Sequence, residues 1–177
     1  YLLGRHPEWQ DKARAECQAL GKDRPAYDDL DKLVVLDKVF KESLRLHPSV
    51  PIQVRRTTRA IEMGGYNIPA YTQVCTVPSF SHYMSEYWTN PTAFDPDRFD
   101  DDRAEHKSHS FAFAPFGGGA HKCIGMHFAI MNAKLFLFLF LNRYKFRLAD
   151  HASDKMQSIP LPKPADGVPL VVEKLAD

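Results

Sequence analysis

The sequence has little cysteine and no excess of charge of one sign, and both absences narrow the class of protein. Its 177 residues include three cysteines, an odd count without repeated spacing. This count argues against a disulfide framework and favours a reduced, intracellular setting. Lysine and arginine (23) nearly balance aspartate and glutamate (22), which leaves a formal net charge of +1. No strong field therefore selects nucleic acid or an anionic membrane surface as a partner.

Long hydrophobic runs are also missing. The most apolar segment, 124–143, is interrupted by Asn132 and Lys134, and its longest unbroken apolar run is 135–141. A membrane-spanning helix needs about 20 consecutive apolar residues, so this segment is predicted to be a fully buried core helix. No targeting segment, internal repeat or low-complexity tract is visible. A membrane anchor upstream of these residues is left open.

What is present is an ordinary globular composition, 44% hydrophobic and 25% charged, which argues against disorder. The length is typical of one domain, and we expect residues 1–177 to form one partial domain without an internal boundary. The chain begins at Tyr1 without a methionine, and Leu2-Leu3 followed by Gly4 resembles a last helical turn with its C′ glycine. We therefore expect a fragment of a longer protein.

Periodicity and turn residues predict a mainly α chain with small antiparallel β-sheets, an α+β class. Helices are predicted over 7–20, 32–46 and 124–143, with a short one over 79–88. Strands are predicted over 52–58, 61–63, 66–68 and 73–77, and a last β pair has a turn at 166–167 before 168–173. The segment 90–122 is predicted to be irregular, but its phenylalanines favour an ordered, packed coil.

A carboxylate within an apolar helix stripe is the first feature that suggests a site. Glu42 shares a helix face with Val39 and Leu46, and Arg45 lies three residues further on. A buried carboxylate must be paired, so a second cation from elsewhere in the chain would complete the pairing. The alternative is an ordinary surface ion pair, worth well under ~1 kcal/mol.

A glycine-rich segment before the apolar helix is the second feature. Residues 116–125 read Phe-Gly-Gly-Gly-Ala-His-Lys-Cys-Ile-Gly. Glycines allow the backbone to pass close to a bulky planar group, and the helix N-terminus beside Cys123 favours a thiolate. A thiolate in a glycine-lined, phenylalanine-flanked pocket is what axial ligation of haem iron requires.

Three other interpretations of this segment compete with haem ligation. A phosphate-binding loop would need a glycine spacing that is not present. A zinc site could use His121, Cys123 and His127, with His106 or His109 as the fourth ligand, but the spacing is unfamiliar. Cys123 could also be an inert core thiol.

Taken together and in order, these segments resemble the cytochrome P450 superfamily. Residues 116–125 resemble its haem-binding loop, 42–45 resemble the Glu-x-x-Arg of its K helix, and Pro96-Asp97-Arg98-Phe99 resembles its Pro-Glu-Arg-Phe motif. The resemblance covers nearly the whole chain. It implies the C-terminal half of the cytochrome P450 fold, with the K and L helices and the cysteine-ligand loop. One departure is His82-Tyr83-Met84, where the family commonly has His-Arg-Asp.

The resemblance also implies roles for individual residues. Cys123 would be the thiolate ligand of the iron in haem b and the only catalytic ligand in this fragment, while His121 and Arg55 would pair with the haem propionates. Phe116 would pack near the sulfur, and the loop glycines Gly117 and Gly125 would line the cofactor. A network of Glu42, Arg45 and Arg98 would brace the coil around the haem. The implied substrate contacts are Val50, Ile52, Gln53, Met156 and Gln157.

The function implied by the resemblance is that of a haem-thiolate monooxygenase. It would insert one oxygen atom from O2 into a hydrophobic organic substrate, with electrons from NAD(P)H through a ferredoxin or flavoprotein reductase. Lys107 and Lys122 would lie on the side that meets an acidic partner. A peroxygenase or isomerase and a non-catalytic haem sensor of the same fold are the alternatives. The family's distal acid–Thr pair has no match here, so we expect the isolated fragment to be inactive and poorly stable, with large exposed apolar patches.

Overall fold

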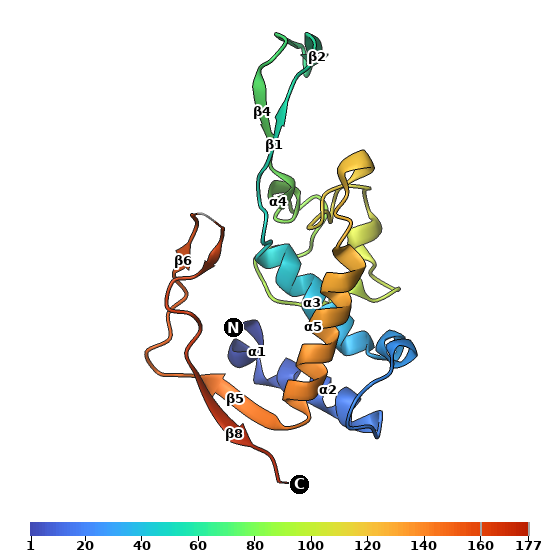
Figure 1. Cartoon of the computed structure of the whole chain (residues 1–177), viewed down its shortest axis with the longest axis vertical. Coiled ribbons are helices and arrows are strands. Elements are labelled where there is room, and N and C mark those ends of the chain that lie inside the picture. The colour runs from blue at the N-terminus through green and yellow to red at the C-terminus, as the bar shows by residue number, and fades with distance from the viewer. Residues whose placement is uncertain (160, 177) are drawn as a thin grey trace.

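The computed structural model describes residues 1–159 and 161–176 and shows a group of helices flanked by small two-stranded sheets (Figure 1). The expected domain range, 1–177, includes residues 160 and 177, which lie outside this description. The α-helices are α1 (Leu2–Arg5), α2 (Pro7–Ala19), α3 (Val34–Leu46), α4 (Pro78–Ser81) and α5 (Met126–Leu141). The 3-10 helices are η1 (Tyr27–Lys32), η2 (Pro96–Phe99), η3 (Glu105–Lys107) and η4 (Gly119–His121). The strands are β1 (Gln53–Arg56), β2 (Ile61–Met63), β3 (Tyr66–Ile68), β4 (Gln73–Thr76), β5 (Tyr144–Leu148), β6 (Met156–Gln157), β7 (Lys163–Pro164) and β8 (Leu170–Lys174).

Within residues 1–159 and 161–176, the strands form four two-stranded sheets, which confirms the mainly α class with small antiparallel sheets. The pairs are β1–β4, β2–β3, β5–β8 and β6–β7, and all four are antiparallel. The first two pairs form one long hairpin that projects away from the helices in Figure 1. Gly64 and Gly65 close its tip with φ of +59° and +80°, the left-handed conformation that a two-residue hairpin turn of this kind requires.

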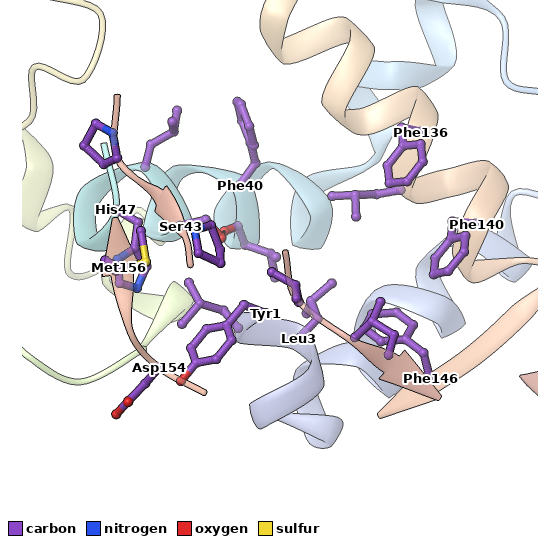
Figure 2. A pocket seen from close by; sticks show the side chains of 18 of the residues that line it. Tyr1, Leu3, Phe40, Ser43, His47, Phe136, Phe140, Phe146, Asp154 and Met156 are labelled. Atoms are coloured by element: carbon purple, nitrogen blue, oxygen red, sulfur yellow. Dashed lines mark hydrogen bonds between the residues drawn. The ribbon is translucent and has the colours of Figure 1, made fainter. Parts of the chain in front are cut away.

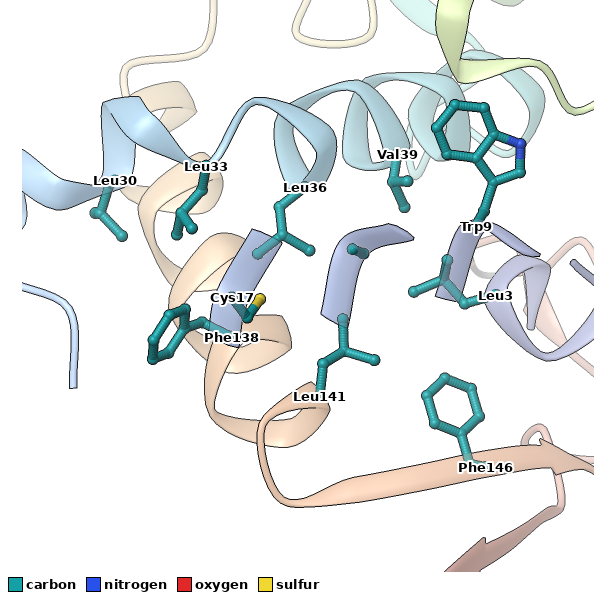
Figure 3. Packing of buried hydrophobic residues seen from close by; sticks show 11 residues of the cluster. Leu3, Trp9, Cys17, Leu30, Leu33, Leu36, Val39, Phe138, Leu141 and Phe146 are labelled. Atoms are coloured by element: carbon teal, nitrogen blue, oxygen red, sulfur yellow. The ribbon is translucent and has the colours of Figure 1, made fainter. Parts of the chain in front are cut away.

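The main hydrophobic core lies between α2, α3 and α5, and β5 covers one end of it (Figure 3). Its buried members are Leu3, Trp9, Ala13, Cys17, Leu30, Leu33, Leu36, Val39, Phe138, Leu141 and Phe146. Leu36 and Phe138 are fully buried, and truncating such a side chain to alanine typically costs about 2–5 kcal/mol. This core fixes the direction of α3 and α5, the two helices on which the candidate site residues depend.

Helix α3 presents one apolar face to this core and carries a charge on the same face. Leu36 and Val39 are buried on that face, and Glu42 follows with no exposed surface. The helix ends at Leu46, two residues before Pro48, as expected because the residue before a proline is pushed out of the helical region. The sequence therefore places a carboxylate in the buried interior.

A buried glutamine joins α2 to β5. The Gln10 side-chain N–H groups donate to the carbonyl oxygens of Leu3 (3.1 Å) and Phe146 (2.9 Å). Its side-chain oxygen accepts from the backbone N–H of Phe146 (3.1 Å) and from Arg14 (2.7 Å). Both backbone groups of Phe146 are thus paired with one amide, in the way that a neighbouring strand would pair them.

Helix α5 is buried on one face only, so the prediction of a fully buried helix was wrong. Phe138 and Leu141 are buried in the core, whereas Phe128 (66%) and Phe136 (64%) are exposed on another face. Lys134 lies on the buried side, where its ammonium pairs with Asp37 (3.2 Å). Among the described residues, no helix is both long enough and apolar enough to cross a membrane.

Four further expectations require correction. Gly4 lies inside α1 and is not a C′ residue, and a Cβ there would come within 3.0 Å of Leu148. The helix predicted over 79–88 is the single turn α4, because the chain turns after it. The predicted irregular segment 90–122 contains the three 3-10 helices η2, η3 and η4. The final strand β8 pairs with β5, a strand that the sequence reading missed, so no hairpin at 166–167 forms that pair.

Candidate functional site

Glu42 is the centre of a buried ion-pair network. Its two carboxylate oxygens accept from Arg45 Nε (2.7 Å) and Nη2 (2.8 Å), a bidentate pair within one helix. Arg98 Nε, from η2, donates to the same carboxylate at 3.0 Å. All three side chains have no exposed surface. Burial of three charges is tolerated only where each is paired and its remaining donors are satisfied.

Backbone carbonyls satisfy the remaining donors of Arg45, and backbone carbonyls together with the Glu105 carboxylate satisfy those of Arg98. Arg45 donates to the carbonyls of His82 (2.7 Å), Pro91 (2.6 Å) and Ala93 (3.0 Å). Arg98 donates to Thr89 O (2.8 Å) and pairs with Glu105 (2.7 Å). The network therefore attaches the irregular chain between residues 82 and 105 to helix α3.

The glycine-rich loop is closed by its own backbone. The N–H of Cys123 donates to the carbonyl of Phe116 (2.9 Å), and the N–H of Gly117 donates to Ala114 O (3.0 Å). Gly117 has a φ of +71°, a conformation that costs other residues about 1–2 kcal/mol. Cys123 is exposed and lies three residues before the start of α5. The loop thus presents one thiol at the surface beside a helix N-terminus.

Strand β1 lies directly beside this loop. A Cβ added to Gly117 would be 2.8 Å from Gln53 Nε2. Gln53 Oε1 accepts from Arg55 Nη2 at 3.2 Å, and the Arg55 guanidinium is exposed. The structure therefore brings Gln53, Arg55 and Gly117 together. Gln53 thus contacts both the loop and Arg55. The sequence did not predict the contact between Gln53 and the loop.

The residues around the thiol fit a haem group. The sulfur of Cys123 is a soft ligand of the kind that iron takes in haem-thiolate proteins. A Cβ on Gly118 would approach Phe111 to 2.6 Å, so the loop leaves no room for side chains at this point. Ile124 is fully exposed and Phe116 is half-buried, which provides apolar surface for a macrocycle. His121 is exposed on η4 and, like Arg55, is free to contact a bound group.

The zinc alternative is not supported by the arrangement of side chains. Within residues 1–159 and 161–176, no group of three or more histidine, cysteine, aspartate or glutamate side chains is placed to hold a metal ion. His121, Cys123 and His127 therefore do not converge on one point. Axial ligation of haem iron, by contrast, requires only one thiolate from the protein.

A cavity of about 610 Å³ lies between α1, α3, α5 and the C-terminal strands (Figure 2). Phe40, Phe136 and Met156 line it from three different elements. Of the five expected substrate contacts, Met156 is the one that lines this cavity. The others occupy different positions: Val50 and Ile52 are exposed before β1, Gln53 faces the loop, and the Gln157 side chain donates to Ile159 O at 2.8 Å.

The sequence reading missed the aromatic residues that line this cavity. Phe136 and Phe140 lie four residues apart on α5 with stacked rings whose centroids are 5.7 Å apart. Their i, i+4 spacing was the available signal, because residues four apart share a helix face.

Comparison with known proteins extends these observations. The cytochrome P450 family model matches residues 1–168. A putative cytochrome P450 136 from Mycobacterium tuberculosis is 41% identical over 173 residues, which are 97% of this chain and 35% of that protein. Cytochrome P450 4F8 from Homo sapiens is 37% identical over 180 residues, 99% of this chain and 34% of that protein. The chain thus spans about a third of the length of these curated relatives.

A solved structure, a cyanobacterial CYP120A1 with bound retinoic acid, superposes with a TM-score of 0.91 at 29% identity. The match covers 98% of this chain and 40% of that protein. Fold, loop and relatives together define the class of haem-thiolate proteins. Within that class, the chain belongs to the cytochrome P450 family.

Proposed function

We propose that this chain is the C-terminal, haem-ligating part of a haem-thiolate monooxygenase. One observation carries the proposal: the exposed Cys123 thiol lies at the end of a backbone-closed glycine loop, three residues before α5, and Gly117 of the same loop lies against Gln53 on the strand that bears Arg55. Family membership supports the haem cofactor. The chain covers about a third of its relatives, which supports a larger protein as the active species.

The proposed reaction inserts one atom of O2 into a C–H bond of an apolar substrate. The second oxygen atom leaves as water after two electrons and two protons have been taken up. NAD(P)H supplies the electrons through a ferredoxin or flavoprotein partner. Haem bound at Cys123 would supply the iron centre that binds and reduces O2.

Each side chain near the loop then has a definite task. Cys123 donates electron density from its sulfur, and Arg55 and His121 neutralise the propionate carboxylates. Phe116 excludes water from the sulfur, which tunes the potential of the centre. Gly117 and Gly125 keep the loop free of side chains. The Glu42, Arg45 and Arg98 network holds the preceding coil in position.

Two exposed lysines are the proposed contacts of the redox partner. Lys122 is adjacent to Cys123 in the chain, and Lys107 pairs loosely with exposed Asp101 (3.2 Å). Charge attraction of this kind raises association rates and weakens with salt. Charge reversal at Lys122 should therefore slow reduction at low ionic strength, and identical kinetics at every salt concentration would count against the assignment.

The decisive experiment uses the native polypeptide that carries this sequence, loaded with haem. Reduction with dithionite under carbon monoxide should give a strongly red-shifted Soret band, and Cys123→Ala should abolish it. Cys75→Ala is the matched control, because Cys75 is also an exposed free cysteine, and this variant should keep the band. An unshifted band in the haem-loaded wild type would overturn the proposal.

A second measurement separates the alternative functions. A monooxygenase consumes NAD(P)H and O2 together when a reductase and a substrate are supplied. A peroxygenase forms product from hydrogen peroxide without NAD(P)H, an isomerase needs neither, and a sensor forms no product at all. The red-shifted band without any NAD(P)H-dependent turnover would leave the haem site standing and remove the monooxygenase assignment.

A further inference from the structure

His82 is a buried histidine that the functions proposed above do not use. It follows α4, has no exposed surface, and packs against Phe113 with ring centroids 5.5 Å apart. Both ring nitrogens have partners on segments far away in the sequence. Nδ1 lies 3.1 Å from the carbonyl oxygen of Arg45, and Nε2 lies 3.0 Å from the backbone nitrogen of Ala114.

The chemistry of these partners fixes the tautomer of the ring. The backbone nitrogen of Ala114 can only donate, so Nε2 must be the unprotonated acceptor. The carbonyl of Arg45 can only accept, so Nδ1 carries the proton and donates it. Burial lowers the pKa of His82 to about 4, which keeps the ring neutral at physiological pH, as both hydrogen bonds require.

His82 joins the two parts of the candidate site. On one side, its own carbonyl accepts from Arg45 Nη1 (2.7 Å), and Arg45 is paired with Glu42. On the other side, Ala114 accepts at its carbonyl from the N–H of Gly117, the first glycine of the loop. The N–H of Cys123 then closes the loop on Phe116. Hydrogen bonds, joined by short stretches of the chain itself, therefore link the buried carboxylate of α3 to the thiol loop.

We propose that His82 is a positioning residue that transmits the geometry of the Glu42–Arg45 pair to the Cys123 loop through its hydrogen bond to Ala114. The inference rests on the proposed function, in which Cys123 binds the haem iron. Among the described residues, His82 is the side chain that accepts from the Ala114 N–H. Without an acceptor at this point, the segment that leads into the loop loses its attachment to α3 on this side.

Two amide substitutions test this bond selectively. In His82→Gln the side chain reaches the position of Nε2 and can accept from Ala114. In His82→Asn the shorter side chain reaches only the position of Nδ1 and leaves the Ala114 N–H unpaired. The two variants have similar polarity and differ in which bond they keep: Gln keeps the acceptor for the Ala114 N–H, whereas Asn keeps the donor to the Arg45 carbonyl. His82→Phe removes both bonds and keeps the ring packing against Phe113.

The measurement is amide hydrogen exchange in the native polypeptide that carries this sequence, followed at Ala114, Gly117 and Cys123. We expect about tenfold faster exchange at these three amides in His82→Asn and His82→Phe, a change of about 1.4 kcal/mol. His82→Gln should remain near the wild-type rates. Gln10→Leu is the control, because it also removes a fully hydrogen-bonded buried side chain, whose partners are Leu3 and Phe146 and not the glycine loop.

Equal protection in His82→Asn and His82→Gln would overturn the proposal. So would a rise in exchange that is spread over the whole chain as in Gln10→Leu, since that is the result of a merely structural role. If His82→Phe does not fold, the Asn and Gln variants still decide the question. The haem assignment is tested separately, by the position of the Soret band of the reduced carbon monoxide complex. A failure of that band in the wild type removes the haem assignment without changing the exchange result.

Discussion

Replacement of Glu42 by glutamine is the most informative test of how the fold is held together. The substitution keeps the shape of the side chain and removes one negative charge. It leaves Arg45 and Arg98 buried beside a neutral amide, with no exposed surface on either guanidinium. The carboxylate also accepts from the backbone N–H of Asp95 at 3.0 Å, so a fourth bond is weakened by the same change.

The expected loss of stability is large. Breaking a buried ion pair by removing one partner typically costs about 3–5 kcal/mol, because a buried charge is left uncompensated. Arg98 keeps its pair with Glu105 at 2.7 Å. We therefore expect the loss of stability in Glu42→Gln to lie near the lower end of this range, at about 3 kcal/mol. Since natural domains are stable by only about 5–15 kcal/mol, this is a large share of the total.

The assay is urea unfolding of the wild type and the variant, followed by circular dichroism. Asp150→Asn is the matched control, because Asp150 pairs with Arg147 at a similar distance of 2.9 Å but is 94% exposed. Exposed pairs contribute below about 1 kcal/mol, so this variant should be close to the wild type. If Glu42→Gln loses no more than Asp150→Asn, the carboxylate is not the counter-ion on which the two arginines depend, and the reasoning fails.

Three further results are expected. Gly117→Ala should lower the free energy of unfolding by about 1–2 kcal/mol, because φ is +71° and the new Cβ would meet Gln53 at 2.8 Å. Thermal melts measure this loss, and an unchanged melting temperature would contradict it. Gln10→Leu should cost about 1–3 kcal/mol for each backbone group of Phe146 left unpaired, measured by urea unfolding, and a neutral result would show that water replaces the amide. Burial lowers the pKa of His82 from 6.5 to about 4. Between these two pH values, the His82 ring is protonated in the unfolded chain and neutral in the folded chain. The His82 contribution to the free energy of unfolding should therefore fall by about 3 kcal/mol as the pH drops from 6.5 to about 4. His82→Phe should flatten this part of the pH profile of stability. An identical profile in the variant would refute the lowered pKa of His82.

Much of the local structure follows from the sequence alone. The apolar spacing before Gly21 and before Pro48 predicted α2 and α3, because a helix repeats every 3.6 residues and these two residues end it. The same spacing predicted that Arg45 lies beside Glu42. Gly64-Gly65 predicted the hairpin of β2 and β3. All of these features depend on residues that are close together in the chain.

Contacts between distant segments could not be derived in this way. No periodicity indicates that β5 pairs with β8, or that the amide of Gln10 pairs with Phe146 across 136 positions. The apolar character of α5 indicated burial, but it did not reveal that Phe128 and Phe136 stay exposed. The hydrophobic content of a helix says how much surface favours burial, whereas the neighbours available in space decide which face is covered.

The same distinction between local motifs and distant contacts applies to the candidate site. The order of Glu42, Arg98 and Cys123 along the chain was sufficient to indicate the family, because each lies in a short motif that is readable on its own. The tertiary structure alone decided that Gln53 faces Gly117 and that His82 lies between Arg45 and Ala114. The physical reason is that a hydrogen bond depends on positions to within a few tenths of an ångström. Positions of that precision, for residues far apart in the sequence, are set by the packing of the whole core.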